Sequence, residues 1–249
     1  MPGDTFTLRL RRQSLEKTPE GYAYWKVHDE TRSMPARECA VLLCDVWDTH
    51  PCRGAAERVA AMVPRMNAAI QAARARGALI VHAPSDTMPF YAEHPARKRA
   101  LAAKEIPPPP ERERDDPPLP FDPTKDCCDT DKLSETYNWT RQHPGIEIDS
   151  ERDVIGDSGP QLLNVYAERG VKRLLIMGVH TGMCILRRSF AIKKMVRWGF
   201  EVALVRDLTD ALYNPALPPY VSQREGTQLV IGYIEKFWCP SFESSDLIG

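Results

Sequence analysis

Residues 38–47 read ECAVLLCDVW, a continuous apolar run of strand length that is followed at once by acidic and aromatic residues. A run without alternation is typical of a strand that is covered on both faces, as in the middle of a parallel sheet. A second such run, ALIVHA at residues 78–83, comes after an amphipathic segment at residues 55–77. The order strand, helix, strand predicts a parallel βαβ unit at this point.

The rest of the chain repeats this alternation. Further strand-like runs are GIEI (145–148), RLLIMGV (173–179) and EVALVRD (201–207), and helical patterns cover residues 160–170, 184–199 and 227–238. Strands that alternate with helices predict an α/β fold with three layers, in which helices cover both faces of a mostly parallel sheet of Rossmann-like order. We expect this domain to span residues 38–249.

Two segments depart from the pattern. Residues 1–37 are polar and alternate in TFTLRLR and YAYWKV, which predicts an N-terminal extension or hairpin. Residues 106–130 carry many prolines and charges, which exclude a helix or a central strand. A loop of this length inside a compact domain is usually functional or disordered, so the Pro-rich insertion is expected to be a lid or a subunit contact.

Composition limits the partners. The 249 residues have a net charge of −1 and show no basic stripe, which argues against nucleic acid and against a membrane surface. The first residues contain no apolar signal segment, and no apolar run approaches the length of a membrane span. Seven scattered cysteines fit reduced thiols better than a disulfide framework. A cytoplasmic protein that acts on a small molecule is therefore expected.

Chemically active side chains follow the predicted strands where those strands end. In an open parallel sheet, ligands bind beyond the carboxyl ends of the strands, so these side chains are expected to meet at one edge. The residues in question are Asp45, Asp48 and His50, then His82 and Asp86, then His180, Thr181 and Cys184, and finally Asp207 and Asp210. Carboxylates, histidines and a cysteine at one edge predict a catalytic or binding site.

Cys184 is the most informative of these residues because it lies between a buried strand and a predicted helix. The unpaired N–H groups of a helix start lower the pKa of a thiol and can accept an oxyanion. Asp45 is the predicted acceptor of the thiol proton, since a carboxylate directly after a buried strand is costly unless it is paired or functional. The alternative for Cys184 is a small apolar core residue, which free cysteines often are.

Two motifs resemble those of the isochorismatase-like cysteine hydrolases. CDVWDTH at residues 44–50 is similar to the first family motif, and GVHTGMC at residues 178–184 is similar to the second, which ends in the nucleophilic cysteine. The similarity in strand order and spacing extends over residues 38–238. WTRQ at residues 139–142 and VRDLTDALYNP at residues 205–215 further resemble a little-characterised branch of this superfamily.

The resemblance implies a mechanism. A triad of Asp, Lys and Cys attacks the C–N bond of a small amide-type substrate and forms a thioester acyl-enzyme, with Asp45 deprotonating Cys184. A cis peptide bond at Val179–His180 directs the backbone N–H groups of His180 and Cys184 at the oxyanion. The presence of the cysteine argues against vinyl-ether hydrolysis, whose enzymes lack it. Superfamily members commonly form homo-oligomers, which is the assembly expected here.

The sequence departs from the family at the lysine. Residues 145–161, GIEIDSERDVIGDSGPQ, contain none, and Arg141 is the cation predicted to replace it as a catalytic residue, with Lys132 as a second candidate. An arginine can stabilise a thiolate or bind a carboxylate but does not readily lose a proton. A surface ion pair is the alternative for Arg141. The missing lysine also leaves open a weakened relative that binds a small metabolite or a partner without turnover.

Metal and substrate contacts complete the predictions. Some relatives hold a divalent metal with an Asp-x-His pair. Asp48 and His50 have that spacing but follow the first strand instead of the second, and His82 with Asp86 or His94 is another source of ligands. No cluster matches a zinc pattern, so no cofactor is expected and hydrogen-bonded histidines are the simpler interpretation.

The predicted substrate contacts are Trp47, His82, Phe90 and His180, with plain packing as the alternative for the two aromatic residues. Asp207 and Asp210 are expected to orient an arginine or cap a helix, and Cys127–Cys128 to be structural or incidental.

Overall fold

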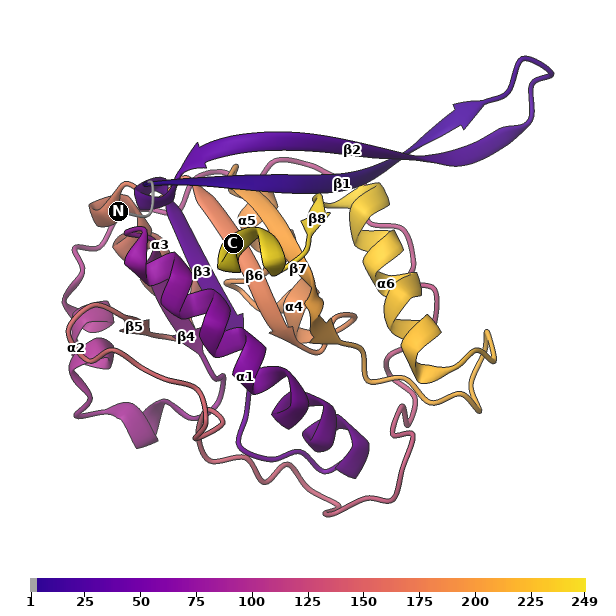
Figure 1. Cartoon of the computed structure of the whole chain (residues 1–249). Helices are drawn as coiled ribbons and strands as arrows, with labels where there is room; N and C mark the ends of the chain where they lie inside the picture. Colours follow the sequence, from indigo (N-terminus) through magenta and orange to yellow (C-terminus); the bar gives the residue numbers. More distant parts are fainter. Residues whose placement is uncertain (1–3) are drawn as a thin grey trace.

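The computed structural model describes residues 4–249, which build one eight-stranded sheet with the order β2-β1-β8-β7-β6-β3-β4-β5 (Figure 1). β1 is antiparallel to both of its neighbours, β2 and β8, and all other neighbouring strands are parallel. The strands are β1 (Thr5–Lys17), β2 (Ala23–Pro35), β3 (Cys39–Cys44), β4 (Leu79–Ala83), β5 (Val154–Ile155), β6 (Arg173–Val179), β7 (Glu201–Asp210) and β8 (Ser241–Phe242).

Helices cover both faces of this sheet, so the predicted three-layer α/β fold is confirmed. α1 (Arg53–Ala75) and α7 (Ser245–Ile248) lie on the face that is nearer the viewer in Figure 1. The opposite face carries α3 (Gly159–Arg169), α4 (Cys184–Arg187), α5 (Ile192–Arg197) and α6 (Gln223–Phe237). α2 (Pro95–Ala102) lies near β5, and short 3₁₀ helices span Ala36–Glu38 and Met88–Tyr91.

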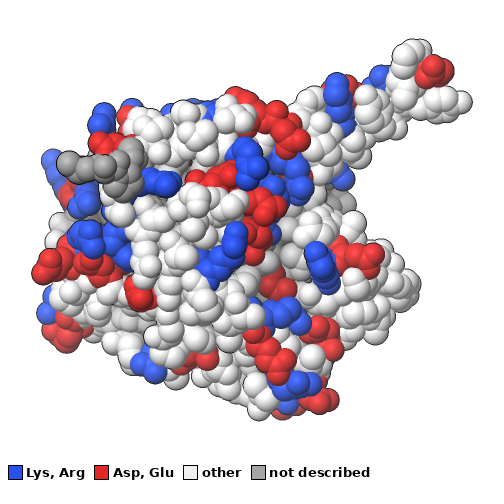
Figure 2. Space-filling view, in the orientation of Figure 1, with Lys and Arg blue, Asp and Glu red and all other residues white. Residues whose placement is uncertain are grey.

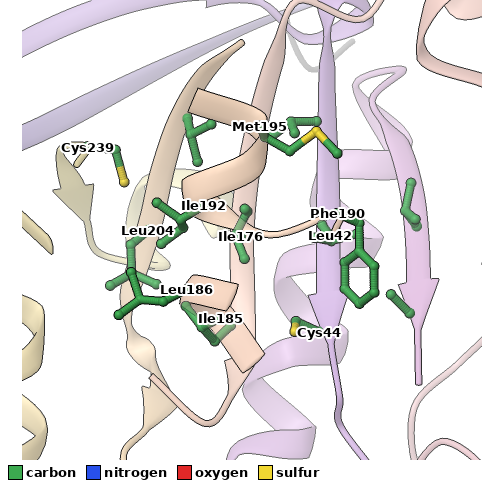
Figure 3. Packing of buried hydrophobic residues seen from close by; sticks show 14 of the residues in the cluster. Leu42, Cys44, Ile176, Ile185, Leu186, Phe190, Ile192, Met195, Leu204 and Cys239 are labelled. Carbon is green, nitrogen blue, oxygen red and sulfur yellow. The ribbon is translucent and has the colours of Figure 1, made fainter. Parts of the chain in front are cut away.

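The central strands are buried on both faces, as their continuous apolar sequences predict. Leu42 packs with one core cluster and Leu43 with the other, because successive side chains of a strand point to opposite faces. Figure 3 shows Leu42, Ile176 and Leu204 of three neighbouring strands beneath Ile192 and Met195 of α5. The parallel strands therefore form a rigid base whose carboxyl ends carry the site.

Two predicted elements differ from the structure. GIEI at residues 145–148 is not a strand, because Asn67 of α1 binds the carbonyl of Gly145 and the N–H of Glu147 and holds the segment as a loop. The strand at this edge is β5 instead. The single helix predicted over residues 184–199 is interrupted, since the chain leaves α4 at Arg188 with an extended ψ of 150° and starts α5 at Ile192.

The N-terminal residues form a long hairpin of β1 and β2 that crosses the amino ends of the parallel strands and projects beyond the body (Figure 1). Phe6, Leu8 and Leu10 are buried in the core on the α1 side, whereas β2 is exposed along most of its length. The base of the hairpin is thus part of the domain core, and its outer part is not.

Charges of both signs are mixed over the face shown in Figure 2. In the described part of the chain, no helix has the length and apolar character that crossing a bilayer requires.

Residues 103–153 contain no helix or extended strand, in agreement with the effect predicted for the prolines in residues 106–130. A disulfide joins Cys128 of this segment to Cys52, directly before α1, across a sequence separation of 76 residues. The expectation of reduced thiols is therefore wrong for these two cysteines. Arg58 adds two hydrogen bonds to Asp129, and Thr130 accepts the N–H of Gly54. The segment is fixed to the start of α1 at this point.

The disulfide is expected to contribute to stability because it closes a long loop in the unfolded chain. The double variant Cys52→Ser/Cys128→Ser should lose about 2–4 kcal/mol of unfolding free energy, as loop-closure entropy predicts. Urea denaturation without reductant measures this loss. Cys127→Ser, which changes the adjacent unpaired thiol, is the matched control and should lose less. A wild-type protein whose urea midpoint does not respond to reductant would contradict the prediction.

Candidate active site

Asp45 directly follows β3, has a positive φ of 52° and has no exposed surface. Its Oδ1 accepts the N–H of Ser85 at 2.8 Å, and its Oδ2 accepts a hydrogen bond from Nε of Arg188 at 3.0 Å. Burial raises the pKa of this carboxyl group, and the charge of Arg188 opposes that rise. The side chain is thus a desolvated carboxylate with two fixed donors.

Cys184 begins α4, and its thiol interacts with the Asp45 carboxylate. Burial and the Asp45 charge raise the pKa of this thiol to about 12. The predicted lowering toward thiolate is therefore not found in the free protein. α4 comprises only four residues, and desolvation together with a neighbouring carboxylate outweighs what so short a helix can supply.

The backbone before Cys184 has the predicted form. The Val179–His180 peptide bond is cis. The His180 backbone lowers the pKa of the Cys184 thiol and partly offsets the effect of burial. Stabilisation of negative charge on the sulfur favours a reaction at this atom.

Arg188 is the cation at this site, and the sequence interpretation missed it. Its guanidinium bridges Asp45 and Asp86, with Nη2 at 2.9 Å from Oδ2 of Asp86. Burial favours a lower pKa for Arg188, but the charges of Asp45 and Cys184 raise the pKa above its ordinary value. The signal in the sequence was the spacing, because Arg188 follows Cys184 by four residues and so lies on the same side of a helical turn.

The two cations that were predicted from the sequence, Arg141 and Lys132, pair with other residues. The Arg141 guanidinium is 5.4 Å from the ring centre of Phe90, and its carbonyl accepts the N–H of Asp48. Lys132 forms an ion pair with Asp126 at 2.8 Å. Among the contacts of residues 4–249, neither cation is hydrogen-bonded or ion-paired to Asp45 or Cys184. The structure brings together Asp45, Cys184 and Arg188, and the catalytic role of Arg141 stays a prediction.

An aromatic group lies beside the cluster. Trp47 donates its ring N–H to the carbonyl of Ser85 at 3.0 Å and stacks on Trp139 with ring centres 3.9 Å apart. His180 lies 4.8 Å from His50, ring centre to ring centre, and its Nε2 is buried without a hydrogen-bond partner in the described residues. Phe90 is 56% exposed and covers the Arg141 guanidinium. Trp47 is thus linked to Asp45 through Ser85, whereas Phe90 lies against Arg141 and Tyr91. Direct substrate contact by these two aromatic residues remains a prediction.

The remaining histidines are engaged in the protein itself. His82 is fully buried, with its ring nitrogens 3.1 Å from Gln142 and 3.0 Å from Asp153, so that neither is free for a substrate. His50 accepts the N–H of Cys52, and Asp48 accepts both the N–H and the hydroxyl of Thr140. In the described residues, no group of three His, Cys, Asp or Glu side chains is arranged to hold a metal.

Asp207 and Asp210 orient arginines, as predicted. Asp210 accepts a hydrogen bond from Nε of Arg58 at 2.9 Å, and its backbone carbonyl accepts the N–H of Thr181 in the turn before Cys184. Asp207 forms an ion pair with Arg65 at 3.1 Å. Asp210 therefore connects α1 to the cysteine turn.

Comparison with known proteins agrees with this fold. The family model for the isochorismatase domain matches residues 39–216. A cysteine hydrolase from Pseudomonas syringae pv. phaseolicola 1448A has a similar structure, with a TM-score of 0.55 at 17% identity, covering 86% of this chain and 92% of that one. An isochorismatase from Pseudomonas putida KT2440 has a TM-score of 0.52 at 15% identity, covering 86% and 91% respectively. No curated protein sequence matches the chain significantly.

Removal of the Arg188 charge is expected to change the titration of the cluster. Because this charge lowers the pKa of both Asp45 and Cys184, Arg188→Gln should raise the apparent pKa for alkylation of Cys184 by about 1 unit or more. Below the pKa, a rise of about 1 unit lowers the thiolate fraction about tenfold. The rate of iodoacetamide labelling at Cys184, followed by peptide mass spectrometry between about pH 6 and 11, should therefore fall about tenfold at each pH.

Arg187→Gln is the matched control, since this neighbouring arginine has no ion pair among the described residues. Arg188→Lys should keep most of the wild-type profile because it keeps the charge. If Arg188→Gln and Arg187→Gln gave superimposable profiles, the cluster would not depend on Arg188.

Proposed function

Because the chain belongs to the isochorismatase domain family, we propose that this hydrolase uses Cys184 to cleave the C–N bond of a small amide-type substrate. The observation that carries the proposal is the contact of Cys184 with a fully buried carboxylate, Asp45, which is itself paired with Arg188. A buried carboxylate that accepts a proton from a neighbouring thiol is the arrangement that activates a cysteine nucleophile.

The first half of the reaction makes the thioester. Sγ of Cys184 attacks the carbonyl carbon as its proton moves to Asp45, and the C=O electron pair moves onto oxygen. The backbone N–H groups of His180 and of Cys184, the first residue of α4, stabilise this oxyanion. The intermediate collapses, the C–N bond breaks, and Asp45 returns the proton to the departing nitrogen.

Water completes the reaction. Asp45 accepts a proton from water as the oxygen attacks the thioester carbon, and collapse of the second intermediate expels the thiolate. The proton on Asp45 then returns to Cys184, so the acid product is released and the cluster is restored. Asp45 is suited to both transfers because burial raises its pKa, which makes the carboxylate a stronger base.

Arg188 acts as a permanent charge. A guanidinium does not lose its proton under these conditions, so Arg188 does not replace a lysine that exchanges protons. It holds Asp45 in place and lowers the pKa of the Cys184 thiol, which burial raises to about 12. The thiolate is therefore formed during attack on the substrate and is not stored in the free protein.

Binding without turnover is the second candidate function. The observation that favours it is the same raised thiol pKa, since a protonated cysteine reacts slowly unless the substrate itself promotes proton transfer. In this case the cluster would hold a small polar metabolite, and Cys184 would be a contact only.

Turnover of a carboxamide panel is expected to depend on Cys184 and Asp45. Ammonia release should fall by roughly 10³-fold or more in Cys184→Ala and in Asp45→Asn, because each change removes a group that acts in the transition state. Intact-mass spectra of rapidly quenched wild-type samples should show an acyl adduct on Cys184.

Cys127→Ala is the matched control, because this buried free thiol lies outside the cluster, and it should leave turnover unchanged. Equal turnover by the wild type and Cys184→Ala would sink the hydrolase mechanism. Saturable binding of an amide without turnover or adduct would support the binding function instead.

A further inference from the structure

A cavity of about 330 Å³ lies at the edge of the sheet opposite to Cys184. Its walls come from the hairpin, from Arg173 at the start of β6, from Glu201 at the start of β7 and from the segment around Arg112. The seven residues of β6 separate this edge from the cysteine turn, a distance of about 20 Å for an extended strand. The cavity is therefore separate from the candidate active site.

Part of the cavity wall is apolar. Leu10 and Met34 of the hairpin, Leu175 of β6, and Phe200 and Trp238 line it. These side chains come from four parts of the chain and surround a volume that is large enough for an aromatic ring or a short aliphatic chain. The cavity thus offers an apolar body a place out of water.

The rim carries an excess of positive charge. Five arginines and two glutamates line the cavity, and both glutamates are already paired. Glu201 pairs with Arg32 and Arg173, and Glu30 pairs with Arg32. In residues 4–249, the other three arginines form no ion pair with a carboxylate; these are Arg12, Arg112 and Arg114.

Two of these three guanidiniums are positioned by neutral groups. Arg114 donates Nε to the carbonyl of Phe237 at 2.7 Å and lies 5.6 Å from the Trp238 ring centre. Arg112 lies directly against Gly199, where a Cβ would be only 2.9 Å from Nη2, and its N–H binds the carbonyl of Arg197. Such contacts fix the orientation of a guanidinium and leave its charge unneutralised.

The third arginine, Arg12, lines the same cavity as Arg112 and Arg114. Arg112 and Arg114 also border an adjoining hollow, whose acidic side chains form no ion pair with either arginine in residues 4–249. Three arginines that lack a carboxylate partner in the described residues and share one cavity with apolar side chains suit a ligand with an anionic head and an apolar body.

We propose that this cavity is a second binding site, which takes a small organic anion with its phosphate or carboxylate group on Arg12, Arg112 and Arg114 and its apolar body against Phe200 and Trp238. The site does not rest on the proposed hydrolase function, because it shares no residue with the cysteine cluster. Its ligand is a separate molecule from the substrate at Cys184.

Fluorescence of anilinonaphthalene sulfonate, an aromatic anion, tests the site. The wild type should bind this probe saturably, and Arg12→Gln/Arg112→Gln/Arg114→Gln should weaken its binding at least tenfold. Phenyl phosphate should displace the probe at lower concentration than inorganic phosphate or phenol, because it offers both the head and the body. Cys184→Ala should bind the probe as the wild type does.

The matched control is Arg37→Gln/Arg169→Gln/Arg224→Gln, which removes three exposed arginines that do not line the cavity. The single variant Arg12→Gln, whose side chain forms no ion pair in the described residues, guards against misfolding and should weaken binding by about twofold to fourfold. Absence of saturable binding, equal binding by the two triple variants, or displacement by phenol as strong as by phenyl phosphate would each overturn the proposal.

Discussion

The candidate site at the carboxyl edge of the sheet depends on one buried carboxylate, Asp45, whose charge must be compensated by its neighbours. Asp45 has no exposed surface, and a carboxylate without water needs a charge and hydrogen bonds to remain ionised. Ser85 and Arg188 supply these. Arg188 follows Cys184 by four residues, so the single turn of α4 places both side chains beside Asp45.

That dependence also explains which parts could be predicted from the sequence. Apolar runs such as AVLLC predict buried parallel strands, and the carboxyl ends of parallel strands meet at one edge of the sheet. Asp45 and Cys184, which follow two neighbouring strands, could therefore be predicted from the sequence to lie close together. Arg188 was missed because the cation was expected before the fourth strand, where the family lysine lies, although its four-residue spacing from Cys184 is visible in the sequence. The break between α4 and α5 was missed as well, since it depends on tertiary contacts such as the one between Ser189 and Gly159. GIEI was assigned wrongly for a similar reason, since hydrogen bonds from Asn67 override its local strand preference.

The pKa of Cys184 could not be predicted from its position at the start of a helix alone. A cysteine at a helix start is expected to have a low pKa, yet burial and the neighbouring carboxylate raise this one to about 12. The same carboxylate that makes the free thiol unreactive is the group that can take its proton. In the proposed mechanism the thiolate therefore forms only as a bound carbonyl is attacked and the backbone N–H groups of the cysteine turn favour charge on oxygen.

The segment 103–153 connects the two edges of the sheet without any regular structure of its own. At the amino edge Arg112 rests on Gly199, and at the carboxyl edge Cys128 is bonded to Cys52 and Trp139 stacks on Trp47. Because prolines disfavour regular structure in this segment, its position depends on these side-chain anchors and on backbone bridges such as Trp47–Gln142 and Cys52–Lys132. The same chain thus supplies guanidiniums to the anion cavity and aromatic surface beside the cysteine cluster. A ligand that binds Arg112 and Arg114 therefore acts on a segment whose other end lies next to Trp47, and the disulfide keeps that end at a fixed position against α1.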